Sequence, residues 1–165
     1  QLKRLYEKQI IETVDLRAPI GAAIDAMRPA FVEKSVVLSA ATGHAPCMIV
    51  GDYSELEQLF VNLLLNAHEA TPSGGMARVE IAVDAGRAIV AIVDTGPGVP
   101  PELLERVFDP FFSTKEQGSG LGLAICASIV QTHGGRLKAA NREVGGAVFT
   151  VEFPLAVGAA LAVPV

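Results

Sequence analysis

The sequence predicts an α/β two-layer sandwich in which a mixed β-sheet carries about three helices on one face. Two patterns predict this class. Short strand-like apolar runs alternate along the chain with three longer segments of helical periodicity. A turn signal also joins two of the strand-like runs directly, which is typical of an antiparallel hairpin. At 165 residues, half of them hydrophobic, the chain has the size of one domain and can bury a substantial core.

The first half of the chain combines short strands with two helices. Residues 1–11 have apolar side chains at helical spacing and begin with Gln1 rather than Met, so we expect the end of a helix that belongs to a preceding segment. A helix opens near Pro19 and runs to Val32. Short strands are expected at residues 13–16, 36–38 and 48–50.

The clearest helix spans residues 54–70. Ser54 is a favourable N-cap residue, and Glu57 follows it at the spacing of a capping box. The sequence Pro-Ser-Gly-Gly at 72–75 ends the helix.

The second half begins with the hairpin and contains one long connection. The hairpin turn lies at residues 84–87. Prolines 97, 100 and 101 interrupt regular structure, so we expect a connection from Val99 to Gly120 with one helical turn at 102–106. The remaining elements are strands at 79–83 and 88–93, a helix at 121–133, and closing strands at 136–140 and 147–153.

Two asparagines lie on one polar stripe of the 54–70 helix. Asn62 and Asn66 share this stripe with two glutamates and a glutamine, and leucines flank it. Asparagine is a poor helix-interior residue, and its amide oxygen is a neutral ligand for a hard cation such as Mg²⁺. The stripe therefore indicates a metal-assisted phosphate site. The alternative is an ordinary exposed or internally bonded pair of asparagines.

Two glycine-rich segments are candidates for contact with a ligand. Asp94 ends a strand, and Gly96 and Gly98 follow it where a ligand could approach the backbone, although this is also an ordinary turn composition. The second segment leads into the 121–133 helix, whose free N–H groups and dipole attract phosphate. It is neither a Rossmann motif nor a P-loop. It comprises Gly118, Gly120, Leu121 and Gly122, with Lys115 upstream as a phosphate contact or a solvated loop residue.

Composition excludes several classes of protein. The net charge of -5 gives no broad attraction for nucleic acid. Cys47 and Cys126 are far apart in the sequence and form neither a metal-binding pair nor a disulfide framework, which fits a reducing cytoplasm. The sequence contains no apolar run of the roughly 20 residues that a membrane span needs.

The Asn stripe, the Asp94 loop and the glycines at 118–122, together with Phe108-Asp109-Pro110-Phe111-Phe112, resemble the N, G1, G2 and F boxes of the histidine kinase catalytic domain. This domain belongs to the GHKL ATPase superfamily, whose Bergerat-type fold binds ATP. The resemblance covers residues 15–155. The segment at 108–115 is similar to the same segment of sensor kinases of the nitrogen-regulation type.

The resemblance implies a role for each matching residue. Asn66 would coordinate Mg²⁺ with help from Asn62, and Asp94 would accept a hydrogen bond from the adenine amino group. Residues 99–119 would form a lid over the phosphates. The further ATP contacts implied are Gly96, Gly98, Val99, Lys115, Gly118, Gly120, Leu121, Gly122 and Thr150, and Phe108, Phe111 and Phe112 would anchor the lid or simply belong to the core.

The resemblance also implies that phosphate moves to a separate acceptor. Hydrolytic relatives carry a water-activating Glu at the position of Asn62, and an amide cannot act as a base. The acceptor would be a histidine outside this chain, because His68 lies two residues past Asn66 and cannot reach the γ-phosphate in line. One departure is that Glu69 and Ala70 stand where many sensor kinases have a Lys and an aromatic residue.

We therefore expect a cytoplasmic ATP-binding domain at residues 12–155. Residues 1–11 would end the dimerisation and phosphoacceptor domain, and an apolar tail follows at 156–165. The expected partners are that domain, a response regulator and a second copy in a homodimer. Membrane attachment of the full-length protein, a serine kinase or ATPase of the same superfamily, and a binding module without transfer activity stay open.

Overall fold

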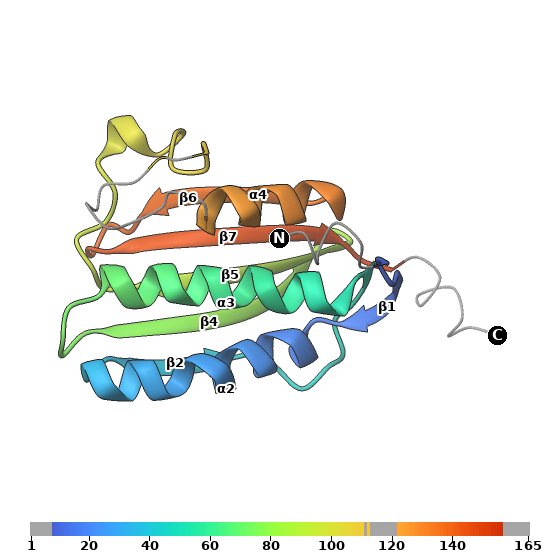
Figure 1. Ribbon diagram of the computed structural model, residues 1–165, viewed down its shortest axis with the longest axis horizontal. Helices are drawn as coiled ribbons and strands as arrows, with labels where there is room; N and C mark the ends of the chain where they lie inside the picture. The colour runs from blue at the N-terminus through green and yellow to red at the C-terminus, as the bar shows by residue number, and fades with distance from the viewer. Residues whose placement is uncertain (1–7, 111, 113–121, 157–165) are drawn as a thin grey trace.

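In the computed structural model, which describes residues 8–110, 112 and 122–156, three helices cover one face of a five-stranded sheet (Figure 1). The strand order is β2-β4-β5-β7-β6, with β2 and β4 parallel and the other pairs antiparallel. This confirms the predicted two-layer sandwich with a mixed sheet. The sheet strands are β2 (Val37–Ala41), β4 (Met76–Asp84), β5 (Arg87–Asp94), β6 (Arg136–Asn141) and β7 (Ala147–Pro154).

Two further strands form a separate ribbon. β1 (Glu12–Asp15) pairs antiparallel with β3 (Met48–Gly51). β3 therefore does not join the main sheet, although its sequence has the same apolar character as the sheet strands. The ribbon lies at the end of the sandwich where α3 begins (Figure 1).

The helices are α2 (Arg17–Lys34), α3 (Tyr53–Ala70) and α4 (Gly122–Thr132), and α3 lies between the other two (Figure 1). α2 extends beyond the predicted 19–32 at both ends and contains Pro29. Its C-cap is Ser35, which adopts a left-handed conformation with φ of 62°.

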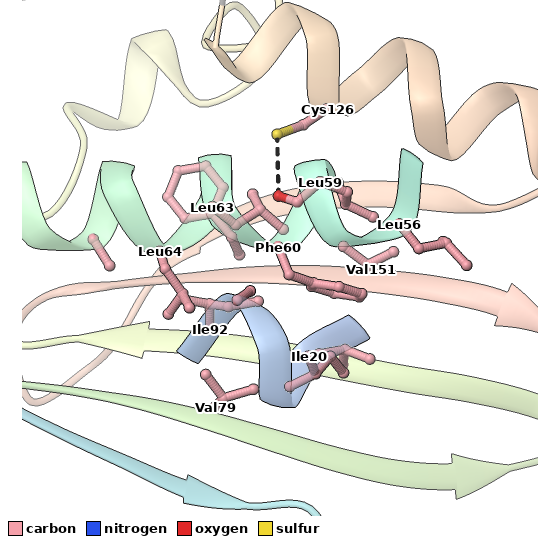
Figure 2. Close-up of a cluster of buried hydrophobic side chains, with 14 of the residues drawn as sticks. Ile20, Leu56, Leu59, Phe60, Leu63, Leu64, Val79, Ile92, Cys126 and Val151 are labelled. Atoms are coloured by element: carbon pink, nitrogen blue, oxygen red, sulfur yellow. Dashed lines mark hydrogen bonds between the residues drawn. The ribbon is translucent and has the colours of Figure 1, made fainter. Parts of the chain in front are cut away.

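The core lies between the helices and the sheet (Figure 2). Phe60 and Leu64 of α3 pack over the sheet, and Cys126 of α4 donates a hydrogen bond from Sγ to the Leu59 carbonyl at 3.7 Å. Burial raises the pKa of the Cys126 thiol to about 12. Cys126 therefore serves as a small apolar packing residue between two helices.

The predicted cap of α3 is wrong. Asp52, not Ser54, is the N-cap residue, and its Oδ1 accepts from the Glu55 N–H at 2.9 Å. Its Oδ2 accepts from the Ile10 N–H at 2.8 Å, and its own N–H donates to His133 Nε2 at 3.1 Å. Distant contacts therefore decide where the helix begins. We call Ile10, Asp52, Glu55 and His133 the Asp52 cluster.

The predicted hairpin is confirmed. β4 and β5 pair from Ala77–Asp94 to Asp84–Arg87, which leaves a two-residue turn. Both turn residues, Ala85 and Gly86, have positive φ of 51° and 77°. This geometry matches the twist of the flanking strands and is typical of a type I′ turn.

Candidate functional site

Several of the predicted site residues lie at one end of the sandwich. β5, the C-terminal end of α3, the first turn of α4 and the connection after β5 all reach this end (Figure 1). The Asp52 cluster lies at the opposite end of α3. Because α3 spans the distance between them, it links two sites with different neighbours.

Asp94 ends β5 as a nearly inaccessible side chain with 1% of its surface exposed. Its Oδ1 accepts from the Gly96 N–H at 2.9 Å and from the Ala147 N–H at 3.3 Å. Its Oδ2 is buried and has no hydrogen-bond partner among the described residues. Buried polar atoms are rarely left in this state, so Oδ2 is a free acceptor held in a fixed position.

Gly96 and Gly98 follow Asp94 in a loop that leaves no space for side chains. A Cβ at Gly96 would collide with the Ala70 carbonyl at the end of α3. Gly98 has φ of +80°, and a Cβ there would lie 2.7 Å from Asn141 Oδ1. The glycines therefore allow the loop to pack against α3 on one side and against the β6–β7 turn on the other.

Asn62 and Asn66 are half-buried on α3. The apolar side of the helix is buried at Leu56, Leu59, Phe60, Leu63 and Leu64. Leu65, on the other flank of the stripe, is 42% exposed. Asn66 lies about two turns after Leu59, whose carbonyl accepts a hydrogen bond from α4, so Asn66 lies on the side of α3 that is near α4.

The described part of the connection carries apolar contacts. A 3₁₀ turn spans Pro101–Leu103, and the Phe108 ring packs edge-on against Phe149 of β7 with centroids 6.0 Å apart. The Arg106 guanidinium lies 5.8 Å from the centre of the Phe112 ring. Phe108 therefore attaches this segment to the sheet core. The third predicted anchor, Phe111, lies outside the described residues.

The second glycine-rich segment is only partly described. Gly122 is the first residue of α4, is exposed, and has open space where a Cβ would stand. The other predicted phosphate contacts lie outside the described residues, so their roles stay predictions. They are Lys115, Gly118, Gly120 and Leu121.

Thr150 does not lie with the other site residues. In β7 the alternate residues Phe149 and Val151 are buried toward the helices, so Thr150 points to the opposite face of the sheet. It pairs with Ala91 and Lys138, away from the Asp94 end of β5. Ala147, at the start of β7, is the residue of this strand that contacts the Asp94 carboxylate.

Two of the histidines have structural partners. His68 Nε2 lies 3.0 Å from the Ala30 carbonyl of α2, and its ring packs edge-on against Phe31. His133 Nδ1 lies 2.8 Å from the Ile129 carbonyl, so Nδ1 carries the proton and Nε2 accepts from the Asp52 N–H. His68 therefore packs against α2 near the C-terminal end of α3, whereas His133 lies beside Asp52 at the opposite end of α3.

The sequence did not indicate the contribution of the β6–β7 turn. Asn141 Oδ1 accepts from the Val99 N–H at 2.8 Å, and Asn141 Nδ2 donates to the Val99 carbonyl at 2.6 Å. Arg142 Nη1 donates to the Asp94 carbonyl at 3.3 Å. An Asn at the end of a strand looks like an ordinary turn residue, so only the fold reveals these contacts.

The assembled site offers one buried free acceptor, a tightly packed glycine loop and two half-buried amides. Among the described residues, no group of three or more His, Cys, Asp and Glu side chains could hold a metal ion. A cation at this end would therefore depend on neutral amide oxygens and on oxygens supplied by a ligand. No helix within the described ranges is long and apolar enough to cross a membrane.

Residues 51–157 match the family model described as histidine kinase-, DNA gyrase B- and HSP90-like ATPase. The chain is 44% identical over 109 residues to sporulation kinase C of Bacillus subtilis (strain 168), covering 66% of this chain and 26% of that protein. It is 35% identical over 147 residues to sensor histidine kinase ZraS of Salmonella typhimurium (strain LT2), covering 88% and 31%. The chain thus spans between a quarter and a third of these relatives.

Solved structures give the same result. The catalytic domain of histidine kinase ThkA has a TM-score of 0.81 and 32% identity, and the match covers 88% of this chain and 95% of that domain. Histidine kinase ThkA in complex with the response regulator TrrA has a TM-score of 0.79 and 28% identity, with 94% of this chain and 45% of that chain covered.

Proposed function

The chain belongs to the histidine kinase-, DNA gyrase B- and HSP90-like ATPase family, and we propose that it is the ATP-binding catalytic domain of a sensor histidine kinase. In this role it binds Mg-ATP and donates the γ-phosphoryl group to a histidine of a separate dimerisation domain. The observation that carries the proposal is the buried Asp94 Oδ2 without a partner among the described residues, at the end of a glycine loop.

Asp94 provides base recognition. Its Oδ1 is occupied by two backbone N–H groups, which fixes the carboxylate and leaves Oδ2 to accept from the adenine amino group. A site built around one buried acceptor rejects a base without that donor, because the acceptor would then stay unpaired. Gly96, Gly98 and Val99 bring the backbone close to the base.

Asn66 and Asn62 are suited to hold Mg²⁺. Their amide oxygens are hard neutral ligands on a half-buried helix face, and the family resemblance supports a metal site there. When bound, Mg²⁺ supplies charge neutralisation for the phosphate oxygens. The neutral amides leave its charge available to them. Lys115 and Gly118 of the lid, together with Gly120, Leu121 and Gly122 at the start of α4, complete the proposed phosphate contacts.

Asn62 also limits hydrolysis. An amide cannot take a proton from water at neutral pH, so the site holds ATP until a nucleophile arrives. The nucleophile is a histidine imidazole. Its unprotonated nitrogen forms a bond to the γ-phosphorus while the bond to the ADP oxygen breaks, and the proton of the other ring nitrogen passes to water. His68 and His133 are unsuited to this role, because each ring is held by a neighbouring carbonyl.

The domain limits and partners follow the same proposal. Residues 12–155 form the catalytic domain, and the tail at 156–165 has no assigned role. Residues 8–11, which the sequence assigned to the end of a helix, are not helical in the structure. The full-length protein would form a homodimer and pass its phosphate to a response regulator. The solved complex of ThkA with its response regulator TrrA supports this partner class.

The first experiment measures nucleotide binding to the chain by calorimetry with ATP and ITP. ITP lacks the exocyclic amino group, so ATP should bind more tightly by about 100-fold. Asn66→Ala should remove the Mg²⁺-dependent part of ATP affinity. The control Gln58→Ala, which also deletes a side-chain amide from α3, should leave that part intact. Equal ATP and ITP affinities would contradict the base assignment.

The second experiment tests transfer. The chain extended by its upstream segment should acquire a phosphoryl group that is labile in acid and stable in base, as expected for phosphohistidine. The isolated 165-residue chain should not label itself. Label on His44, His68 or His133 of the isolated chain, or an acid-stable product typical of phosphoserine, would overturn the proposal.

A further inference from the structure

The β6–β7 turn supports the loop that carries Asp94 and Gly98. We propose that Asn141 is a positioning residue that holds Val99, so that the base side of the nucleotide pocket is formed before ligand binds. This inference rests on the proposed function, because it assigns a role in nucleotide affinity to a residue outside the four family boxes.

The Asn141 side chain forms two hydrogen bonds with the main chain of Val99, as the backbone of a neighbouring β-strand would. Its Oδ1 accepts from the Val99 N–H at 2.8 Å, and its Nδ2 donates to the Val99 carbonyl at 2.6 Å. One side chain therefore satisfies both main-chain polar groups of this residue. Val99 lies where the Asp94 loop ends and the long connection begins, so the bond pair fixes the start of the connection.

Two further contacts bring the turn and the loop together. Arg142 Nη1 donates to the Asp94 carbonyl at 3.3 Å. Gly146 has φ of +89°, and a Cβ at this position would collide with the same carbonyl. The turn therefore packs directly against the Asp94 backbone, while Asn141 holds the other end of the loop.

Gly98 and Asn141 are fitted to each other. A Cβ at Gly98 would lie 2.7 Å from Asn141 Oδ1 and 3.4 Å from the Gly146 carbonyl. Because glycine has no side chain, the Asn141 amide can approach the chain at Gly98. Without the amide, the loop from Asp94 to Val99 keeps its contact with Ala70 but loses its hold at Val99.

The energetic consequence concerns preorganisation. A loop already held in its bound position loses little further freedom when ligand binds. We call the two hydrogen bonds between Asn141 and Val99 the Asn141 clamp. Because Val99 lies beside the base-recognition loop, loss of the clamp should weaken the binding of adenosine, ADP and ATP by the same factor. A residue that contacted phosphate would instead weaken ATP more than adenosine.

The test compares Asn141→Ala and Asn141→Asp with Glu143→Ala, an exposed residue of the same turn. Asn141→Ala removes both bonds. Asn141→Asp keeps the acceptor for the Val99 N–H but loses the donor to the Val99 carbonyl. We expect Asn141→Ala to lower the affinity for adenosine, ADP and ATP equally, by about tenfold. The affinities of Asn141→Asp should lie between those of Asn141→Ala and the parent. Glu143→Ala should bind all three ligands as the parent does.

Hydrogen exchange of the Val99 amide without nucleotide provides an independent readout. Exchange at Val99 should be faster in Asn141→Ala and close to the parent in Asn141→Asp. Unchanged exchange in Asn141→Ala overturns the clamp, and so does an affinity for all three ligands within twofold of the parent. If the parent chain itself does not bind ATP, the proposed function fails, and exchange at Val99 alone then decides whether the clamp exists.

Discussion

Asp52 and Asp94 are both nearly inaccessible, with 7% and 1% of their surfaces exposed, but their oxygens are used differently. At the start of α3, the two Asp52 oxygens accept from Glu55 and Ile10. At the end of β5, Asp94 uses one oxygen for the fold, and the other has no partner among the described residues. Buried carboxylates of similar exposure can thus have all their oxygens used by the fold at one end of a domain and one oxygen left unused at the other.

The largest effect is expected from Asp94→Asn. Oδ1 faces two N–H donors, so the new Nδ2 would occupy the free position and present a donor to the adenine amino group. ATP affinity should fall by about 100-fold or more, measured by calorimetry. The melting temperature of the nucleotide-free chain should change little, because an acceptor without a partner is replaced by a donor without a partner. Undiminished ATP affinity would end the distinction between the two aspartates.

The next effect is expected at Asp52. Asp52→Ala removes the helix cap and the Ile10 contact and should lower the free energy of unfolding by about 2–4 kcal/mol. Asp52→Asn keeps one oxygen but cannot accept from the N–H groups of both Ile10 and Glu55, so it should lower the free energy of unfolding by about half as much as Asp52→Ala. Chemical denaturation measures both variants. ATP affinity should change less than twofold, and a loss as large as that of Asp94→Asn would contradict the separation of roles.

A smaller effect is expected at Asp15, near the Asp52 end of the molecule. The Arg17 guanidinium holds the pKa of the Asp15 carboxyl below its ordinary value, with a Nη2–Oδ2 distance of 2.7 Å. The lowered pKa contributes stability above pH of about 4, and this stability is lost as pH falls through the lowered pKa. Asp15→Asn should therefore be less stable than the parent at neutral pH, by less than Asp52→Asn.

Denaturation of Asp15→Asn and the parent across pH 2–7 provides the measurement. The two stabilities should converge at the acid end of the range, because the parent carboxyl is then protonated. A difference that stays constant down to the lowest pH would show that shape rather than charge is responsible.

The smallest effect is expected at Cys126, which lies between the Asp52 end and the Asp94 end of the molecule. Burial raises the pKa of Cys126 to about 12, so its thiol should not react with iodoacetamide at pH 8 in the folded protein, with or without ATP. Mass spectrometry of the alkylated peptides checks this, and unfolding in denaturant should make Cys126 reactive. Alkylation of the native chain would show that α3 and α4 separate readily.

The elements were predictable where their signals are local. The hairpin at 84–87, the α3 pattern and the Asp94 loop are each encoded within a short stretch of sequence. The cap of α3 was not predictable, because the Asp52–Glu55 and Ser54–Glu57 pairs have the same spacing. Contacts with Ile10 and His133, 42 and 81 residues away, favour the first.

The site was predictable in its loop and helix but not in its support. Asp94, Gly96 and Gly98 follow a recognisable pattern, whereas Thr150 was assigned by similarity alone and lies on the other sheet face. Asn141 carries no signal of its own, since its role depends on the turn meeting Val99 in three dimensions.

The strand order also has a consequence for synthesis of the chain. β5 pairs with β4 on one side and with β7, the last strand, on the other. Until Pro154 has left the ribosome, one edge of β5 is unpaired and can join other chains. Truncation before β7 should therefore give an aggregating product, and late completion of this sheet makes the domain a slow folder compared with helical proteins of its size.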